Sequence, residues 1–233
     1  MLRAILFDMG GTLDGGGHWL DRFAALYVQA GVHVNRERVR AAFDEAERLA
    51  LSDDAIATCG LEPMVDRHVT WQLATLDVDA TVRPAIVQPF VAAVRRAAVE
   101  NVGTLADLAA RGLKLGVVSN GCGNVDVLCG ELGYAPYLST IVDSRRVGLY
   151  KPDPAIFILA AARLALPASS IMMVGDSFDR DVRPARSAGM MTAWLAGSGE
   201  CPDPSLVDVR FARLSELPAF VETAASVAGA PRS

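Results

Sequence analysis

Short runs of apolar residues that end at small or polar residues recur along the chain. Each run is continuously apolar rather than alternating, which is the pattern of a parallel strand covered by helices on both faces. We therefore expect buried parallel strands at residues 2–7, 113–118, 140–142, 171–174 and 191–195.

Between the later runs, apolar residues recur at spacings of three and four, which predicts amphipathic helices. These helices are expected at residues 102–111, 124–132, 153–164 and 179–188. Alternating strands and helices predict an α/β fold with a doubly wound parallel sheet, in which a ligand lies at the carboxyl ends of the strands. Asp8, Ser119 and Asp176 each follow a predicted strand, so we expect all three at that edge.

Residues 15–100 do not follow this alternation. Their pattern predicts only helices, at residues 19–30, 36–52, 63–76 and 84–100. A chain of 233 residues has the size of one domain that carries an insertion. We therefore expect a helical cap at residues 15–100, inserted into an α/β core formed by residues 1–14 and 101–233, with the Gly15-Gly16-Gly17 run as the hinge.

Composition narrows the possible partners. The chain is 52% hydrophobic and 21% charged, which is typical of a globular protein. Its net charge of -5 offers no basic field for a nucleic acid, and no apolar run approaches the ~20 residues that cross a bilayer. We expect a cytoplasmic protein with no nucleic-acid or membrane partner. The spacing of His18, His33 and His68 suggests no shared metal site, so these side chains are expected at the surface or in packing.

Four short motifs follow one another along the chain: ILFDMGGTL, VVSNG, YKPDPAIF and VGDSFDRDV. In this order and spacing they resemble the four motifs of the haloacid dehalogenase (HAD) superfamily of hydrolases. The resemblance implies a Rossmann-like core. The helical insertion directly after the first motif resembles the C1-type cap of subfamily I, which contains small phosphatases and the dehalogenases themselves.

The resemblance also implies catalytic roles. Asp8 matches the nucleophile of the family, and a carboxylate beside a glycine turn can approach an electrophile closely. Ser119 matches the residue that hydrogen-bonds the transferring group, with Asn120 beside it as a further substrate contact. Lys151 matches the lysine that neutralises charge among the carboxylates and the bound anion.

A magnesium site is the second implication of the resemblance. Mg²⁺ prefers octahedral oxygen ligands and keeps some waters. Asp8, Asp176 and the backbone carbonyl of Gly10 would hold the ion. Asp181 belongs to the same predicted metal site and is expected to lie behind the residues that contact the ion.

Gly10 departs from the pattern of the phosphatases in the family, which carry a second Asp at this position as general acid and base. Loss of such an acid typically costs about 10²–10⁴ in rate when the leaving group is poor. Another acid could substitute, with Asp14 and His18 the nearest in sequence. Alternatively, the leaving group needs no proton, as with a halide or an acyl phosphate, or the site is a catalytically impaired binder of ligands.

Two relatives within the family also lack this second Asp. The 2-haloacid dehalogenases resemble this chain at Ser119 to Gly121. However, Gly175-Asp176-Ser177 resembles the metal-binding form of the last motif and not the form that the dehalogenases carry. Phosphonatase uses a Schiff-base lysine in its cap, and residues 15–100 contain no lysine. The sequence therefore favours an enzyme, a Mg²⁺-dependent hydrolase of small phosphorylated metabolites (phosphate esters or anhydrides) that acts through an aspartyl phosphate. A 2-haloacid dehalogenase and a binding protein remain the alternatives.

Overall fold

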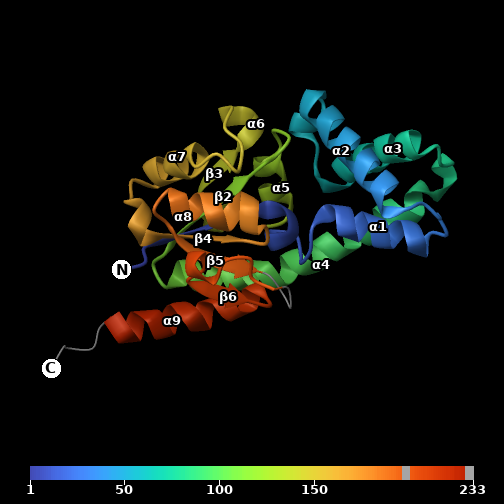
Figure 1. The fold of residues 1–233 in the computed structure, drawn as a ribbon. Helices are drawn as coiled ribbons and strands as arrows, with labels where there is room; N and C mark the ends of the chain where they lie inside the picture. Colours follow the sequence, from blue (N-terminus) through green and yellow to red (C-terminus); the bar gives the residue numbers. More distant parts are fainter. Residues whose placement is uncertain (196–199, 229–233) are drawn as a thin grey trace.

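The computed structural model describes residues 1–195 and 200–228. Its centre is one parallel sheet of six strands in the order β3-β2-β1-β4-β5-β6 (Figure 1). The strands are β1 (Ala4–Phe7), β2 (Lys114–Ser119), β3 (Leu138–Asp143), β4 (Ile171–Gly175), β5 (Met191–Leu195) and β6 (Val209–Phe211). The predicted α/β fold class is confirmed.

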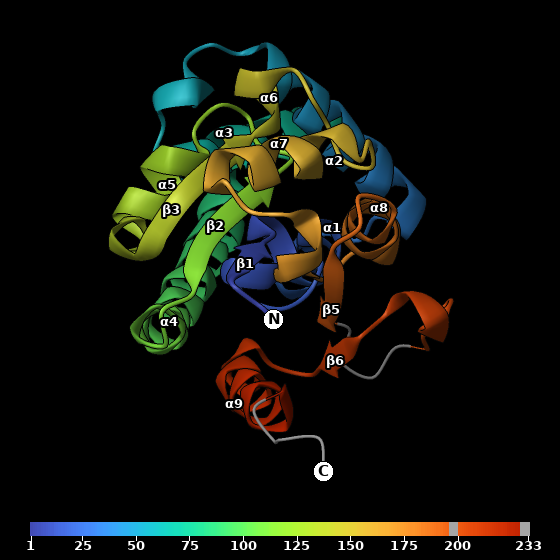
Figure 2. The same ribbon diagram turned by 90° about the vertical axis from the view of Figure 1, so that its left-hand side faces the viewer.

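Alternate residues of the central strand β1 face two separate apolar layers. Ile5 and Phe7 pack in the layer formed by α4 (Arg83–Ala110), α5 (Val125–Glu131) and α9 (Leu217–Ala228). Ala4 and Leu6 pack in the opposite layer, beneath α7 (Ala155–Leu164) and α8 (Arg183–Ser187). Figure 2 shows the sheet between these layers. Burial on both faces explains why the strands are continuously apolar.

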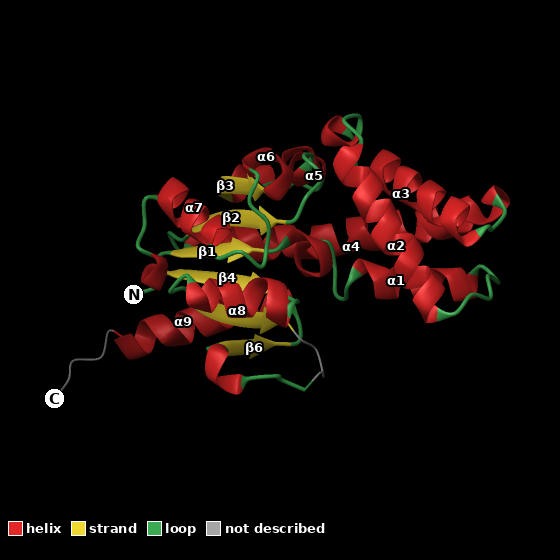
Figure 3. Ribbon diagram, turned by 45° about the horizontal axis from the view of Figure 1, so that its top comes forward, coloured by secondary structure: helices red, strands yellow, loops and turns green. Residues whose placement is uncertain are grey.

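The chain between β1 and β2 is helical, as the sequence predicts. It contains α1 (Trp19–Gln29), α2 (Arg36–Ser52) and α3 (Leu61–Leu76), which lie to one side of the sheet with the first turns of α4 (Figure 3). One more short helix, α6 (Ser144–Val147), directly follows β3 in the core. Within residues 1–195 and 200–228, no helix is both long and apolar enough to cross a membrane.

One expectation about the helices is wrong. The predicted helices at residues 84–100 and 102–111 are a single helix, α4, which runs from the helical region to the sheet. Buried residues continue through the expected break at three- and four-residue spacing, from Val94 and Ala98 to Asn101 and Leu105. Because nothing interrupts this stripe, the helix does not end where the predicted cap ends.

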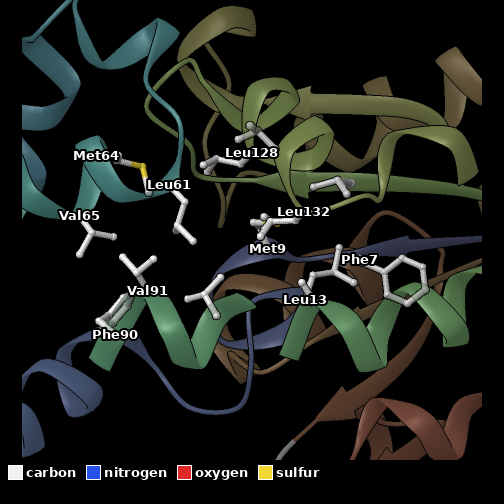
Figure 4. Packing of buried hydrophobic residues seen from close by; sticks show 14 of the residues in the cluster. Phe7, Met9, Leu13, Leu61, Met64, Val65, Phe90, Val91, Leu128 and Leu132 are labelled. Atoms are coloured by element: carbon white, nitrogen blue, oxygen red, sulfur yellow. The ribbon is translucent and has the colours of Figure 1, made fainter. Parts of the chain in front are cut away.

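The helical region and the sheet share one apolar core. Figure 4 shows Met64 of α3 and Phe90 of α4 in the same cluster as Leu128 of α5 and Met9 after β1. Polar contacts add to this interface, since the Arg145 guanidinium donates to the backbone carbonyl of Asp53 at 3.0 Å. The helical region therefore lies closed against the carboxyl ends of the strands.

Candidate active site

Asp8 follows the last residue of β1, and its backbone N–H still donates to the carbonyl of Val174 in β4 at 2.9 Å. The chain then turns sharply through Met9–Leu13, where Gly11 has a φ of 82°. A Cβ at Gly11 would meet the Asp176 carboxyl group, with Cγ only 2.7 Å away. Only glycine satisfies both the left-handed backbone and this close approach of two strand-end loops.

Lys151 joins two buried carboxylates. Its Nζ lies 2.6 Å from Oδ1 of Asp8 and 2.6 Å from Oδ1 of Asp181, and its side chain is 3% exposed. Burial alone would lower the pKa of Lys151, but the charges of Asp181 and Asp8 raise it above its ordinary value. The ammonium is therefore firmly charged and holds the Asp8 carboxylate in place.

Asn120 fixes the backbone of that lysine. Its amide nitrogen donates to the carbonyl of Lys151 at 2.9 Å, and its amide oxygen accepts from the Lys151 N–H at 2.8 Å. The side chain thus positions Lys151, while a direct contact of Asn120 with substrate stays a prediction. Neighbouring Ser119 is buried and lies with Asp8 in the wall of one pocket.

Asp176 and Asp181 lie beyond the end of β4. One carboxylate oxygen from each of Asp8, Asp176 and Asp181 falls in a group whose atoms are all within 4.8 Å of one another. Both oxygens of Asp181 already accept hydrogen bonds: Oδ1 from Nζ of Lys151, and Oδ2 from the N–H of Ser177, 3.0 Å away. Direct metal ligation by Asp181 therefore stays a prediction, and its visible role is to support Lys151.

Asp176 differs from the other two carboxylates. Its Oδ1 is buried without a hydrogen-bond partner among the described residues. Burial, reinforced by the negative charges of Asp8 and Asp181, raises the pKa of Asp176 to about 7. A buried, unpaired carboxylate oxygen is costly unless a proton or a cation meets it, so the donor set fits a hard cation such as Mg²⁺.

A pocket with a volume of about 130 Å³ lies beside Asp8 and Lys151, between the core and the helical region, whereas Asp176 and Asp181 are absent from its described wall. The core contributes polar groups to its wall: Asp8, Gly10, Ser119, Asn120, Lys151 and Arg180. The helical region contributes a largely aromatic wall with one carboxylate: His18, Trp19, Phe43, Glu47, Met64 and His68. The predicted nucleophile thus lies at the floor of a cavity covered by the predicted cap.

The two residues considered as substitutes for the missing acid have different positions. Asp14 is buried and absent from the described pocket wall; its carboxylate accepts from the N–H of Gly11 at 2.7 Å and from the Trp19 indole. Burial raises the pKa of Asp14 to about 6. Asp14 therefore secures the turn after β1 and does not face the pocket.

His18 does line the pocket. Its Nδ1 accepts from the Leu20 N–H at 3.2 Å at the start of α1, so a neutral ring carries its hydrogen on Nε2. Burial, and after it the positive charge of Arg180, lowers the pKa of His18. At neutral pH this ring is a hydrogen-bond donor rather than a strong general acid.

Gly10 is not required by the backbone. Its φ of -74° and ψ of 120° suit any residue, and a Cβ would meet nothing nearer than the Trp19 indole nitrogen at 3.6 Å. The absence of an acidic side chain here is therefore a property of the site and not a consequence of the turn.

Sequence reasoning missed several residues of the pocket wall, above all Glu47, His68 and Arg180. Phe43 and Glu47 are four residues apart on α2, so they share a face, which was the one available signal. Which face meets the nucleophile depends on how the helical region packs on the core. His68 was expected at the surface or in packing. It is buried, but it also lines the pocket, so this expectation is corrected.

Comparisons with known proteins give a family match and several similar proteins. Residues 2–189 match the family of haloacid dehalogenase-like hydrolases. The chain is 26% identical over 205 residues to glyceraldehyde 3-phosphate phosphatase of Methanocaldococcus jannaschii, over 82% of this chain and 84% of that protein. It is 29% identical over 153 residues to (S)-2-haloacid dehalogenase of Pseudomonas sp. (strain YL), over 60% and 64% of the two chains. The HAD phosphatase structure from Thermococcus onnurineus shares the fold with a TM-score of 0.58 at 22% identity, over 94% of this chain and 98% of that one.

Proposed function

Because the chain belongs to the haloacid dehalogenase-like hydrolases, we propose that it is a Mg²⁺-dependent phosphatase of small phosphorylated molecules, working through a phosphoryl group on Asp8. The observation that carries this proposal is the cluster of three carboxylates, Asp8 and Asp181 buried and Asp176 partly buried, with a single lysine. When all are ionised, one ammonium leaves an excess of negative charge, and a divalent cation offsets it. We take residues 15–100 as the cap of the capped subfamily.

Asp8, Asp176 and the Gly10 carbonyl would hold the ion. Mg²⁺ bound there supplies charge neutralisation as a phosphoryl group transfers. The unpartnered Oδ1 of Asp176 supports this assignment, because no other described group meets it.

The residues of the chain perform the remaining steps. Lys151 holds Oδ1 of Asp8, which leaves Oδ2 to attack phosphorus. A bond forms between Oδ2 of Asp8 and phosphorus as the bond from phosphorus to the leaving oxygen breaks, and the leaving group departs as an oxyanion that takes its proton from solvent. Ser119 and Lys151 hold the phosphoryl oxygens. Water then attacks phosphorus, the bond from phosphorus to Asp8 breaks, and inorganic phosphate leaves while a proton of the water passes to solvent.

Gly10 predicts a steep dependence of rate on the leaving group. Aryl and acyl phosphates should react faster than alkyl phosphates by about 10²–10⁴, because a leaving group of low pKa departs without a proton. The Gly10→Asp variant should accelerate alkyl phosphates selectively, since the backbone at this position accepts a side chain. Rates for a series of phosphate esters of graded leaving-group pKa measure both effects. A flat dependence in the native protein would mean that another acid, such as His18, already protonates the leaving oxygen.

Magnesium binding should weaken as the pH falls. Below a pKa of about 7 the Asp176 carboxyl group carries a proton, which must leave before the oxygen can bind the ion. The Kd for Mg²⁺ should therefore rise about tenfold between about pH 8 and about pH 6 and become nearly constant at higher pH. Calorimetric titration of the metal-free protein measures this directly. The Asp176→Asn variant should lose both the affinity and the pH dependence, and a Kd independent of pH in the native protein would argue against Asp176 as a ligand.

A 2-haloacid dehalogenase is the second candidate. Gly10 favours it, because a halide leaves without a proton and needs no acid at this position. The relative from Pseudomonas sp. (strain YL) bears that name. A screen of phosphate esters and 2-haloacids with and without Mg²⁺ separates the two: phosphate release that requires the metal supports the phosphatase, and halide release in chelator supports the dehalogenase.

A further inference from the structure

A chain of hydrogen bonds in the helical region ends at a carboxylate in the pocket wall. The Tyr27 hydroxyl donates to Oε1 of Gln72 at 3.1 Å, and Nε2 of Gln72 lies 2.7 Å from Nδ1 of His68. Nε2 of His68 lies 2.9 Å from Oε1 of Glu47. Tyr27, Gln72 and His68 are buried, whereas Glu47 lines the pocket with the nucleophile Asp8.

The direction of these hydrogen bonds follows from the tyrosine. Because Oε1 of Gln72 accepts from Tyr27, the amide nitrogen donates to Nδ1 of His68. A neutral His68 then carries its hydrogen on Nε2 and donates it to Glu47. Phe23 stacks on the His68 ring with the ring centroids 5.5 Å apart, and Phe43 packs against it at a centroid distance of 5.2 Å, so neighbouring rings restrict its rotation.

Glu47 is thus held at one oxygen and available at the other. Among the described residues, no hydrogen bond to its Oε2 is present. The side chain is 42% exposed and lines the pocket. A carboxylate fixed in this way offers an acceptor to whatever enters the cavity.

The charges of the pocket are separated between its two walls. Both cations of the wall, Lys151 and Arg180, belong to the core, where the phosphoryl group would bind. Arg180 is tied there by the Ser177 hydroxyl, 3.3 Å from its Nε. Glu47 is the carboxylate of the helical wall. A substrate with its phosphoryl group at Asp8 would place its leaving group in the cavity that Glu47 also lines.

We propose that Glu47, positioned by His68, selects the leaving group: it accepts a hydrogen bond from a hydroxyl or ammonium group and repels a carboxylate or a second phosphate. This inference rests on the proposed phosphatase function and names the class of its substrates as monophosphates of small alcohols or amino alcohols. The cavity of about 130 Å³ suits a small leaving group. A carboxylate or a second phosphate placed beside Glu47 meets a like charge, which disfavours acidic leaving groups.

Four phosphates with two-carbon leaving groups test this selectivity: ethyl phosphate, ethylene glycol monophosphate, phosphoethanolamine and phosphoglycolate. They differ at the end of the leaving group, which carries a methyl, a hydroxyl, an ammonium or a carboxylate group. Dissociation constants are measured by calorimetry with Mg²⁺ in the Asp8→Asn variant, so that the readout does not depend on turnover. The hydroxyl and ammonium compounds should bind about tenfold more tightly than ethyl phosphate, and phosphoglycolate more weakly than ethyl phosphate.

Adding Glu47→Gln should reduce these differences to about twofold, because the amide keeps the bond to His68 but removes the charge. Glu45→Gln is the matched control: Glu45 lies on the same helix, is absent from the described pocket wall and is paired with Arg48 at 2.6 Å, and its replacement should change none of the four constants.

Two results would overturn the inference. One is equal affinity for phosphoglycolate and phosphoethanolamine with Glu47 intact. This result does not depend on whether the Glu47→Gln variant folds. The other is a Glu47→Gln protein that melts cooperatively and keeps the original order of affinities. Turnover of p-nitrophenyl phosphate by the native protein is measured separately: its absence would count against the phosphatase function, whereas the binding series alone decides the role of Glu47.

Discussion

The Asp8→Asn variant is expected to lose turnover by a factor on the order of 10⁴ or more while keeping its fold. The amide is nearly the same shape as the carboxylate, and its oxygen can still accept the hydrogen bond that Lys151 donates to Asp8. What it lacks is a nucleophilic oxygen. Initial rates with an activated aryl phosphate, together with a thermal melting curve, measure the two parts of this prediction.

A matched control for this variant lies in the last motif. Asp179→Asn makes the same chemical change at a side chain that is 81% exposed and paired with Arg183. It should leave the rate within about twofold of the native value, as surface substitutions usually do. Substantial activity of Asp8→Asn would remove the covalent mechanism, whatever Asp179→Asn does.

The Lys151→Met variant is expected to lose about 3–5 kcal/mol of unfolding free energy and all activity. The substitution leaves the Asp8 and Asp181 carboxylates buried without their common cation. The raised pKa of Lys151 means that its stabilisation is fully present at neutral pH and is lost only as the pH rises through the pKa of the folded state. Chemical denaturation at neutral pH measures the loss.

Lys114→Met is the control, because Lys114 is the only other lysine of the chain. It donates to the carbonyl of Leu164 at 2.9 Å and faces no carboxylate in the described contacts. Its replacement should cost less than about 1 kcal/mol. Equal losses in the two variants would show that the Asp8–Lys151–Asp181 group contributes nothing specific to stability.

The meeting of the strand-end residues could be predicted from sequence. Asp8, Ser119 and Asp176 follow apolar runs, and in a parallel sheet the carboxyl ends of neighbouring strands lie along one edge. The central order β2-β1-β4 places these three ends side by side. The short edge strand β6 was not predicted, because three residues carry too little pattern.

The cap side of the pocket could not be predicted in the same way. Its wall depends on which faces of α1, α2 and α3 turn toward the core, and helical spacing alone does not choose between faces. Asp14 illustrates the limit. It is near Asp8 in sequence, yet the left-handed turn at Gly11 directs its carboxylate to the backbone and to Trp19 instead of the pocket.

The most direct test of the phosphatase account is to trap the covalent intermediate. Native protein is mixed with an activated phosphate and Mg²⁺, quenched in acid within one turnover, digested and analysed by mass spectrometry. The account predicts one phosphoryl group on the peptide that contains Asp8, lost when Mg²⁺ is removed and absent in Asp8→Asn. Steady turnover with an unmodified Asp8 peptide, or an alkyl ester formed on Asp8 from a 2-haloacid in chelator, would contradict it.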